Sequence, residues 1–484
     1  MELEHYLEQH PETRYLEVLA PDICGVLRGK RVERSDFGKL FGKGVNHCGG
    51  TTLLNIKGAV PEYVDYGSND GDPDVRGTAV AGSLAPVPWA AQSSAQCMMS
   101  LSTFAGEPYP FDPRNVLKRA LQPLLDMGLN PVMATELEFY LVEHDGEQFQ
   151  PRMPRIPGSA LAQDGVQYAT FEDLEEVDDF LKDVDAFCGA QNLPASAALS
   201  EYAPGQFEIN LQHVDDPVLA CDHAALLKRA IRAAARRNGL AATFMAKPFQ
   251  EHAGSGLHLH ISLLDSDGNN VFAGSSADGP FSDTLRHAIG GLAACMNESI
   301  AVMAPNANSY RRYAPGFYAP AMPNWGPNHR GVAIRLPVAS QENVRLEYRV
   351  AGADANPWLA SAAVLAAMHH GISRQIEPPA MVPERAEVEY EPTIPLRWSL
   401  ALNAWQQGRI LPEYFGQEYH RVFERVRREE CDHFNAQVTN RDYEWYLRLA
   451  LKKGCPKAAP TAWKAYVSEY PIYFCRAFRW VFLY

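Results

Sequence analysis

The clearest alternation of apolar and polar positions lies between residues 257 and 264. Aliphatic side chains alternate there with two histidines and a serine, in the order Leu257, His258, Leu259, His260, Ile261, Ser262, Leu263. A period of two predicts a half-buried strand with both imidazoles and the hydroxyl on one face. In a single strand of this kind, histidines that only hydrogen-bond within the fold are more common than histidines that bind a ligand.

Charged side chains recur in further strand-like segments. They are Glu136 and Glu138 within 131–142, Glu201 and Glu208 on the two sides of a Pro204-Gly205 turn, Arg330 and Arg335 within 328–337, and Arg345, Glu347 and Arg349 within 343–350. Like charges on a mostly apolar strand are costly to bury unless a cation lies between them. Exposure of these strands to solvent is the alternative.

Helical spacing of apolar residues begins at Asp112-Pro113 and recurs along the rest of the chain. We expect helices over 112–128, 170–191, 222–238, 283–303 and 356–370. The basic side chains of the third helix are expected to face solvent: Arg229, Arg232, Arg236 and Arg237.

The change from short strand-like runs to helices near residue 110 predicts a domain boundary. Before it, residues 15–19 and 25–30 are a predicted strand pair. We therefore expect an N-terminal domain over 1–108 and a larger domain over 109–453. We expect residues 454–484 to form an atypical extension, whose last part, 471–484, is strongly apolar and aromatic.

Composition narrows the classes of function. The net charge of −14 argues against nucleic-acid binding, because phosphates are neutralised by Lys and Arg. Nine cysteines without a Cys-x-x-Cys motif favour free thiols in a reducing cytoplasm. The sequence has no basic, apolar leader at its start and no apolar run long enough for a bilayer, so we expect no signal peptide and no membrane span.

The charged strands together predict a site for phosphoryl transfer. Five glutamates and a histidine can hold two divalent cations, and oxygen-rich ligation suits Mg²⁺ or Mn²⁺. Arginines in the same cleft match phosphates and carboxylates. The Gly-x-x-x-x-Gly-Lys-Ser/Thr loop is absent from the sequence, so the nucleotide is expected to be held without a P-loop.

Six motifs in a fixed order resemble those of the glutamine synthetase family. They are Glu-Leu-Glu-Phe-Tyr-Leu from Glu136, Glu-Tyr-Ala-Pro-Gly-Gln-Phe-Glu-Ile from Glu201, Gly-Ser-Gly-Leu-His-Leu-His-Ile-Ser from Gly254, Asn-Ser-Tyr-Arg-Arg from Asn308, Asn-His-Arg from Asn328 with Ile-Arg-Leu-Pro, and Arg-Leu-Glu-Tyr-Arg from Arg345. The resemblance covers roughly residues 15–445. It implies an α+β fold, with an N-terminal β-grasp domain and a catalytic domain whose antiparallel barrel-like sheet is flanked by helices. It also implies a homo-oligomer, commonly a dodecamer of two stacked hexamers.

The resemblance also implies a role for each matching residue. Glu138, Glu201 and Glu208 resemble ligands of one metal, and Glu136, His258 and Glu347 those of a second. ATP contacts are implied for His260, Ser262, Arg335 and Arg345, and glutamate contacts for Gly254, Arg312 and Arg349. Arg330, with Arg312, would stabilise the transferred phosphate. The implied reaction uses ATP to convert L-glutamate into γ-glutamyl phosphate, from which an amine displaces phosphate.

Departures from the family pattern bear on the amine. Family members that use ammonia carry an acidic Asp-Gly-Ser-Ser loop, but residues 46–52 read Asn-His-Cys-Gly-Gly-Thr-Thr. Tyr318 replaces a flap glutamate, and Ala253 replaces an asparagine. An ammonium ion without counter-charges is costly to bury, whereas Tyr318 and Trp325 can form walls for an amine with an alkyl chain.

This pattern is similar to the γ-glutamylpolyamine synthetase branch, which implies ligation of glutamate to a polyamine or monoamine as a first step of amine breakdown. A glutamine synthetase that uses ammonia and a non-catalytic relative remain as alternatives. The adenylylation signature Asn-Leu-Tyr is also missing, and Tyr390 within Glu-Tyr-Glu is a poor substitute for it.

Overall fold

The computed structural model describes residues 2–62, 64–144, 146, 148–156, 158–163, 168–274 and 281–450. The chain divides into two compact units, Met1–Phe434 and Asn435–Tyr484. The described part of the second unit is helical, with α12 at Asn440–Asp442, a π-helical turn at Tyr443–Leu447 and α13 at Arg448–Ala450. The extension expected over 454–484 lies outside the described residues.

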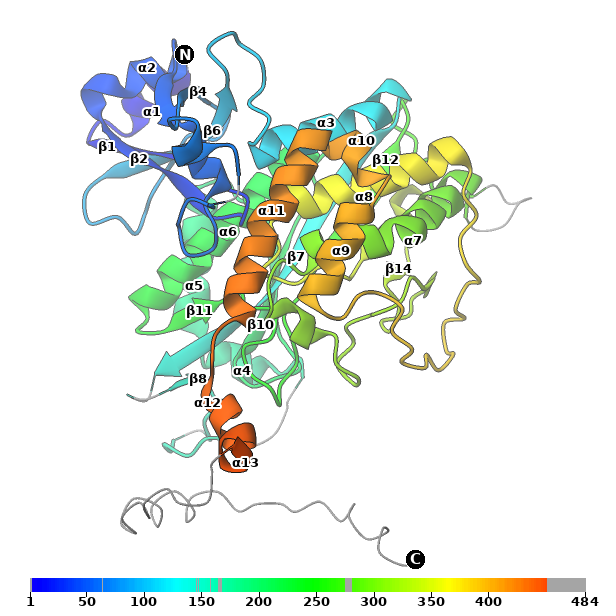
Figure 1. Cartoon of the computed structure of the whole chain (residues 1–484). Helices are drawn as coiled ribbons and strands as arrows, with labels where there is room; N and C mark the ends of the chain where they lie inside the picture. The colour runs from blue at the N-terminus through cyan, green and yellow to red at the C-terminus, as the bar shows by residue number, and fades with distance from the viewer. Residues whose placement is uncertain are drawn as a thin grey trace, which may run out of the picture. The chain divides into compact units, whose positions relative to one another are not determined.

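A six-stranded sheet organises the N-terminal part of the first unit (Figure 1). Its order is β2-β1-β6-β4-β3 with β5 beside β6, and its strands are β1 Tyr15–Pro21, β2 Leu27–Glu33, β3 Val45–Cys48, β4 Asp74–Ala79, β5 Ala85–Pro86 and β6 Ser94–Ser102. β1 runs antiparallel to β2 and parallel to β6, which confirms the predicted strand pair. Helices α1 (Glu2–Gln9) and α2 (Phe37–Phe41) contribute Tyr6 and Phe37 to the core of this sheet.

A nine-stranded sheet forms the centre of the rest of the first unit. Its order is β13-β14-β15-β12-β7-β10-β9, and β8 and β11 also pair with β7. The strands are β7 Asn130–His144, β8 Phe149–Pro151, β9 Ala195–Ser200, β10 Gln206–Leu211, β11 Ala241–Thr243, β12 Leu257–Leu264, β13 Trp325–Pro327, β14 Ile334–Leu336 and β15 Leu346–Tyr348. All pairs are antiparallel except β13 with β14.

Alternating burial gives this sheet its two faces. Along the first part of β7, buried residues such as Leu137 and Phe139 alternate with half-buried ones such as Glu136 and Glu138. The buried residues join the main core. The glutamates therefore lie together on the opposite face, as a period of two requires.

Helices pack against the sheet and against one another (Figure 1). They are α3 Pro113–Asp126, α4 Phe171–Glu175, α5 Asp178–Ala190, α6 Pro217–Arg237, α7 Asp283–Met303, α8 Pro357–Arg374, α9 Trp398–Gln407, α10 Leu411–Phe415 and α11 Gln417–Asn435. Short 3-10 helices lie at η1 Arg34–Asp36, η2 Gly49–Leu53, η3 Gly67–Asn69, η4 Ser309–Arg312 and η5 Gln341–Asn343. α8 contacts α3, α6, α7 and α10 and is buried on all sides over most of its length, as its apolar sequence predicts.

The prediction of one continuous helix over 170–191 was wrong. The segment forms α4 and α5, with a break at Glu176 and Val177, where Val177 has a non-helical backbone. The break lets the Glu176 carboxylate accept the backbone N–H of Arg155 at 2.8 Å while the Val177 side chain is buried. These tertiary contacts outweigh the helical periodicity of the segment.

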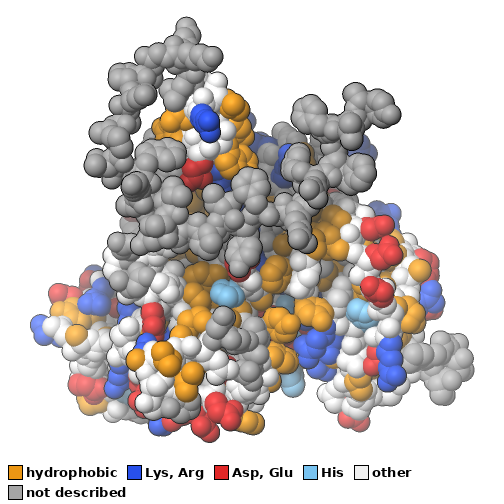
Figure 2. All heavy atoms as spheres, turned by 90° about the horizontal axis from the view of Figure 1, so that it is seen from below, with side chains coloured by type: hydrophobic (Ala, Val, Ile, Leu, Met, Phe, Trp, Pro, Cys, Tyr) orange, Lys and Arg blue, Asp and Glu red, His pale blue; other side chains and the backbone are white. Residues whose placement is uncertain are grey.

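No helix in the described part of the chain combines the length and the apolar character needed to cross a membrane. On the face shown in Figure 2, acidic side chains lie in small groups among basic and apolar ones. The described acidic residues therefore do not form one continuous patch on that face.

Candidate active site

Register across neighbouring strands brings the predicted charged residues together. The opposed pairs are Glu208 of β10 with Glu138 of β7, Glu136 of β7 with His258 of β12, His260 of β12 with Glu347 of β15, and Glu347 with Arg335 of β14. Directly opposed residues of antiparallel strands share a face. One continuous row of charged groups thus runs across five strands.

Three carboxylates gather at one end of this row: Glu138, Glu201 and Glu208. One oxygen of each lies within 4.8 Å of the others. Glu201 follows β9, and its backbone N–H donates to Gln206 O at 2.8 Å across the predicted turn. Gly205 makes that turn at φ +69°, where a Cβ would lie 2.7 Å from Arg152 O, so the turn requires glycine.

Burial and mutual repulsion shift the pKa values in this cluster. Burial raises the pKa of Glu201 to about 7, and the charge of Glu138 adds to the shift. Burial also raises the pKa of Glu208 to about 9, with further contributions from the charges of Glu136, Glu138 and Glu201. Three adjacent carboxylates are costly to ionise together without a cation. Their all-oxygen donor set therefore fits a divalent ion such as Mg²⁺ or Mn²⁺.

A second group of donors surrounds Glu136. His258 Nδ1 lies 3.1 Å from Glu136 Oε2 and 3.8 Å from Glu347 Oε1, and His260 Nε2 lies 2.7 Å from Glu136 Oε1. Burial opposes ionisation, but the contacts with His258 and His260 dominate and lower the pKa of Glu136. The predicted set of Glu136, His258 and Glu347 is thus brought together. His260, expected as an ATP contact, lies close enough to these residues to share a metal with Glu136 and Glu347.

Two guanidinium groups hold Glu347 in its buried position. Arg335 Nη1 donates to Glu347 Oε2 at 2.6 Å, and Arg349 donates to Oε1. Burial opposes ionisation, but Arg349 and then His258 hold the pKa of Glu347 at about 2. Further along the row, Arg345 Nε lies 3.4 Å from His260 Nδ1. Glu347 is therefore an ionised carboxylate whose charge is compensated within the protein.

Glycines allow Arg312 to approach the strand that carries the histidines. The guanidinium of Arg312, at the end of η4, donates to Val350 O at 2.9 Å and to Arg349 O at 3.2 Å. A Cβ on Gly256 would lie 2.7 Å from Arg312 Nη2 and 2.8 Å from His258 Nε2. A Cβ on Gly254 would lie 2.6 Å from Ala246 O and 2.7 Å from Arg312 Cγ. Side chains at these positions would displace the groups around the cavity.

Most of these groups line one cavity of about 320 Å³. The predicted residues in its lining are Glu136, Glu138, Glu201, Glu208, Gly254, His258, Arg312, Tyr318, Arg330 and Arg349. The predicted residues outside its lining are His260, Ser262, Trp325, Arg335, Arg345 and Glu347. The second set is carried on or next to β12, β13, β14 and β15.

A model of the glutamine synthetase catalytic domain matches residues 110–446. The chain belongs to the glutamine synthetase family. Membership of this family accounts for the folding of widely separated motifs into one row of carboxylates, imidazoles and guanidinium groups.

Individual relatives are similar over nearly the whole chain. The γ-glutamylputrescine synthetase PuuA of Escherichia coli K12 is 39% identical over 452 residues, which cover 93% of this chain and 95% of that protein. The γ-glutamylethanolamide synthetase GlnA4 of Streptomyces coelicolor is 30% identical, with 90% and 91% covered. Among solved structures, a GmaS/ADP complex has a TM-score of 0.79 at 25% identity, over 93% of this chain and 100% of that one. The mixed α/β fold with its curved sheet is therefore that of the glutamine synthetase family.

Aromatic side chains line the same cavity as the carboxylates. Besides Tyr318, they are Phe317, Tyr168 and Tyr202. The Tyr168 and Tyr202 rings are 6.4 Å apart between centroids. The Lys247 ammonium lies 3.6 Å from the centre of the Phe317 ring. Tyr318 is 66% exposed and has a φ of +40°, so its side chain reaches the cavity from a loop rather than from the core.

Trp325, predicted as a second wall for the amine, has a different environment. Its side chain is buried at the start of β13, and its indole Nε1 donates to Pro379 O at 2.7 Å. An indole held in this way packs between strands and loop. Tyr318 is thus the one of the two that faces the cavity.

Besides Ala253 and Gly316, sequence reasoning assigned no site role to four described residues of the lining: Tyr168, Tyr202, Gln206 and Phe317. Three of them adjoin predicted residues or lie within a family motif, so the signal was present in the sequence. The side-chain amide of Gln206 donates to Gly254 O at 3.0 Å, which ties the turn to the glycine segment. Tyr168 lies in a polar stretch without periodicity, and only the folded chain brings it to Tyr202.

Proposed function

We propose that this protein is an ATP-dependent ligase that joins the γ-carboxylate of L-glutamate to a small organic amine, a polyamine or a monoamine. The observation that carries the proposal is the composition of the 320 Å³ cavity, in which aromatic side chains face a cluster of carboxylates and arginines. The two named relatives, a γ-glutamylputrescine and a γ-glutamylethanolamide synthetase, support the same substrate class. We infer that the reaction begins the breakdown of the amine.

The reaction proceeds in two balanced steps. A γ-carboxylate oxygen of glutamate attacks the γ-phosphorus of ATP, and the bond to the departing ADP oxygen breaks. The amine nitrogen then attacks the γ-carbon of γ-glutamyl phosphate, the carbon–oxygen bond to phosphate breaks, and the nitrogen loses a proton. The products are a γ-glutamyl amide, ADP and phosphate.

The residues of the cavity and of the adjoining strands β12, β14 and β15 divide this work. Glu138, Glu201 and Glu208 would hold one divalent ion, and Glu136, His258 and Glu347 a second. Bound Mg²⁺ or Mn²⁺ would supply Lewis-acid stabilisation of negative charge on the phosphoryl oxygens. We assign binding of the nucleotide to His260, Ser262, Arg335 and Arg345.

Binding of glutamate and of the transferred phosphate is assigned to other residues that line the cavity. Gly254, Arg312 and Arg349 would hold glutamate, because guanidinium groups bind carboxylates in a bidentate manner. Arg330, together with Arg312, would place positive charge where the phosphoryl group moves. These donors are fixed before reaction, since Arg312 and Arg349 are buried and hydrogen-bonded.

The amine would approach along the aromatic side of the cavity. A protonated amine has favourable interactions with aromatic faces, and an alkyl chain is stabilised by burial against them. Tyr318 supplies such a face at the position where family members that use ammonia carry an acid. The carboxylates of the cavity would serve as counter-charges for the metal ions and not for the amine.

An assay of ADP release with glutamate and a panel of amines tests the proposal. The panel contains ammonium, methylamine, ethanolamine, putrescine and a longer polyamine, and ATP turnover without glutamate is the control. We expect the highest kcat/KM for an organic amine. Comparable turnover of ammonium at low concentration would identify a glutamine synthetase, and no glutamate-dependent turnover with any amine would identify a non-catalytic relative.

We also propose an architecture and a location for this ligase. The N-terminal domain over 1–108 is a β-grasp domain, supported by the central parallel pair of β1 and β6, and residues 109–453 are the catalytic domain. Subunits form a dodecamer of two stacked hexamers, which light scattering of the purified protein tests. The free thiols of Cys24 and the other six described cysteines support a cytoplasmic location.

A further inference from the structure

A second cavity, of about 760 Å³, lies between the N-terminal segments and α6. Cys24 to Leu27 and Trp89 line it from one side, and α6, Phe244 and Asp354 line it from the other. Its described lining shares no residue with the carboxylate cavity. It therefore calls for an explanation separate from the proposed ligase reaction.

Four basic side chains of α6 line this cavity: Lys228, Arg229, Arg232 and Arg236. Three of them are spaced by four residues, so they form one stripe along the helix. Like charges at this spacing repel each other and destabilise a helix. Arg232, Arg236 and Arg237 are exposed, as the sequence predicts, whereas Arg229 is half-buried. The structure adds that Arg229, Arg232 and Arg236 line a cavity.

Among these four side chains, only Arg229 forms an ion pair with a carboxylate that the structure describes. It contacts Glu17 of β1, which also accepts from Arg31 at 2.6 Å. Among the residues that the structure describes, no carboxylate lies within ion-pair distance of Lys228, Arg232 or Arg236. Arg232 and Arg236, and Lys228 when it is protonated, therefore face the cavity without a paired anion.

Asp354 is the one acidic residue in the described lining, and it is a poor counter-ion. Its Oδ2 accepts from Asn306 Nδ2 and from Ser309 Oγ, both at 2.7 Å. Burial raises the pKa of Asp354, and Lys228 offsets this effect only in part. Its carboxylate serves the loop that precedes Arg312 and leaves an excess of positive charge in the cavity.

Two of these side chains, Lys228 and Arg232, are also held in place. Lys228 Nζ donates to Ala353 O at 2.6 Å and lies 5.5 Å from the centre of the Phe244 ring. The Arg232 guanidinium lies 5.0 Å from the same ring on which Lys228 packs. Burial and the charge of Arg232 lower the pKa of Lys228 to about 7. An anion in the cavity would stabilise the charged form of this lysine.

We propose that the α6 cavity binds a small anionic metabolite that carries a phosphate or carboxylate group, through Lys228, Arg232 and Arg236. Guanidinium groups bind both kinds of oxyanion in the same bidentate manner. The volume lies within the range of about 300–1,000 Å³ that is usual for small-molecule sites. The site is additional to the catalytic cavity and independent of which amine the enzyme uses.

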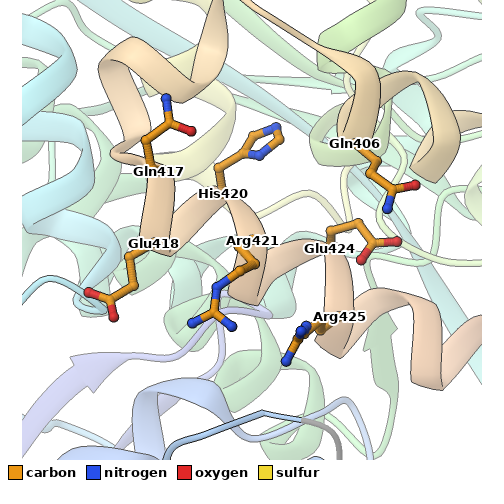
Figure 3. A pocket seen from close by; sticks show the side chains of 7 residues that line it. All are labelled: Gln406, Gln417, Glu418, His420, Arg421, Glu424 and Arg425. Atoms are coloured by element: carbon orange, nitrogen blue, oxygen red, sulfur yellow. The ribbon is translucent and has the colours of Figure 1, made fainter.

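A third hollow, lined by α9 and α11, shows that charged side chains alone do not make an anion-binding site (Figure 3). It is about 560 Å³ in volume, and its lining carries Glu418 and Glu424 together with Arg421 and Arg425. Arg421 also pairs with Asp65 at 3.1 Å. Both signs of charge are present, so this hollow has no unpaired excess that an anion would neutralise.

Calorimetric titration of the full-length protein tests the proposal. The catalytic cavity is first saturated with Mg²⁺, a non-hydrolysable ATP analogue and glutamate. Inorganic phosphate, glucose 6-phosphate and tricarballylate are then titrated separately, so that phosphates and carboxylates are distinguished. We expect binding of at least one probe, weakened tenfold or more by the double substitution Arg232→Gln with Arg236→Gln.

The matched control is Arg237→Gln on the same helix. Arg237 pairs with Asp183 at 3.4 Å and lies against Phe187, outside the described lining of the cavity. We expect its probe affinity to stay within twofold of wild type, and the probe to raise the Tm of wild type and control but not of the double variant. No binding by wild type, or equal binding by all three proteins, would overturn the proposal. A change of oligomeric state in the double variant, without probe binding by wild type, would assign the cavity to a neighbouring copy instead.

Discussion

The catalytic cavity and the α6 cavity gather charges of opposite sign by different structural means. In the catalytic cavity, Glu138 and Glu208 are 70 residues apart in sequence and become neighbours through the register of β7 and β10. In the α6 cavity, Lys228, Arg232 and Arg236 are neighbours because a helix repeats every 3.6 residues. One cluster depends on the whole sheet, and the other on a single helix.

The two clusters also differ in how the protein compensates them. Around Glu347, arginines and histidines neutralise the charge, whereas Glu201 and Glu208 keep raised pKa values because burial and like charges dominate. The charges that the protein leaves uncompensated in each cavity therefore indicate the ligand: divalent cations at the glutamates and a small anion at α6. Variants that remove one charge at a time test these two ligand assignments separately.

The largest effect is expected from loss of a metal ligand. Glu138→Ala or His258→Ala should lower kcat by about a thousandfold or more, because several kcal/mol of charge stabilisation is lost. The fold should persist in Glu138→Ala, since truncation there relieves repulsion among neighbouring carboxylates. Circular dichroism melting and Mn²⁺ binding by electron paramagnetic resonance measure the two consequences separately.

The exposed Glu172 of α4 provides the control, and Glu172→Ala should bind and turn over like wild type. Normal activity of either ligand variant at modest Mg²⁺ would show that the assigned ligands are wrong. Reduced activity with unchanged Mn²⁺ stoichiometry and affinity would show a role other than metal binding.

A smaller effect is expected from Gly256→Ala. The added Cβ would lie 2.7 Å from Arg312 Nη2 and 2.8 Å from His258 Nε2, so both groups must move. Displacement of catalytic groups by about 1 Å costs roughly a hundredfold in rate. Gly38→Ala in α2 meets no atom within 4 Å and is the control for helix stability and activity. Equal kcat/KM in the two variants would contradict the conclusion that a side chain in place of Gly256 displaces Arg312 and His258.

The sequence predicted more of this site than of its surroundings. Period-two alternation placed Glu136 with Glu138 and His258 with His260, because strand geometry alone determines which side chains share a face. The meeting of Glu138 with Glu201 and Glu208 followed from the family resemblance, since register between distant strands leaves no local signal. Tyr168 and the break at Val177 depend on tertiary contacts, and neither could be read from periodicity.

The arginines of α6 show what a local pattern leaves out. The exposure of Arg232 and Arg236 was predicted, but only the folded chain brings Cys24 and Trp89 to the cavity that the basic stripe lines. The boundaries at 108 and 453 and the amine specificity remain predictions. A local pattern gives the position of charges along an element, and the fold decides what lies opposite them.

Glu208→Gln should have opposite effects on stability with and without metal. In chelator-treated protein at neutral pH the variant should be more stable than wild type, by about 1–3 kcal/mol, because a carboxyl with a pKa of about 9 must bind a proton on folding, a cost that the amide does not have. With Mn²⁺ the order should reverse, since wild type gains a ligand interaction that the amide provides only weakly. Thermal melting under both conditions checks this, with Glu172→Gln as the control. Parallel shifts in both conditions would argue against a metal at Glu208.

The smallest effect is expected from Tyr318→Glu, which exchanges an aromatic wall for a counter-charge. The ratio of kcat/KM for ammonium to that for a bulky amine should rise about ten- to a hundredfold, or roughly 1–3 kcal/mol. The KM values of ATP and glutamate should change little, because Tyr318 belongs to a loop and is 66% exposed. Tyr318→Phe keeps the ring and should preserve the wild-type ranking of amines. If Tyr318 only packs within the loop, the glutamate variant loses activity with every amine in the same proportion, and an unchanged ranking rejects the role assigned to this side chain.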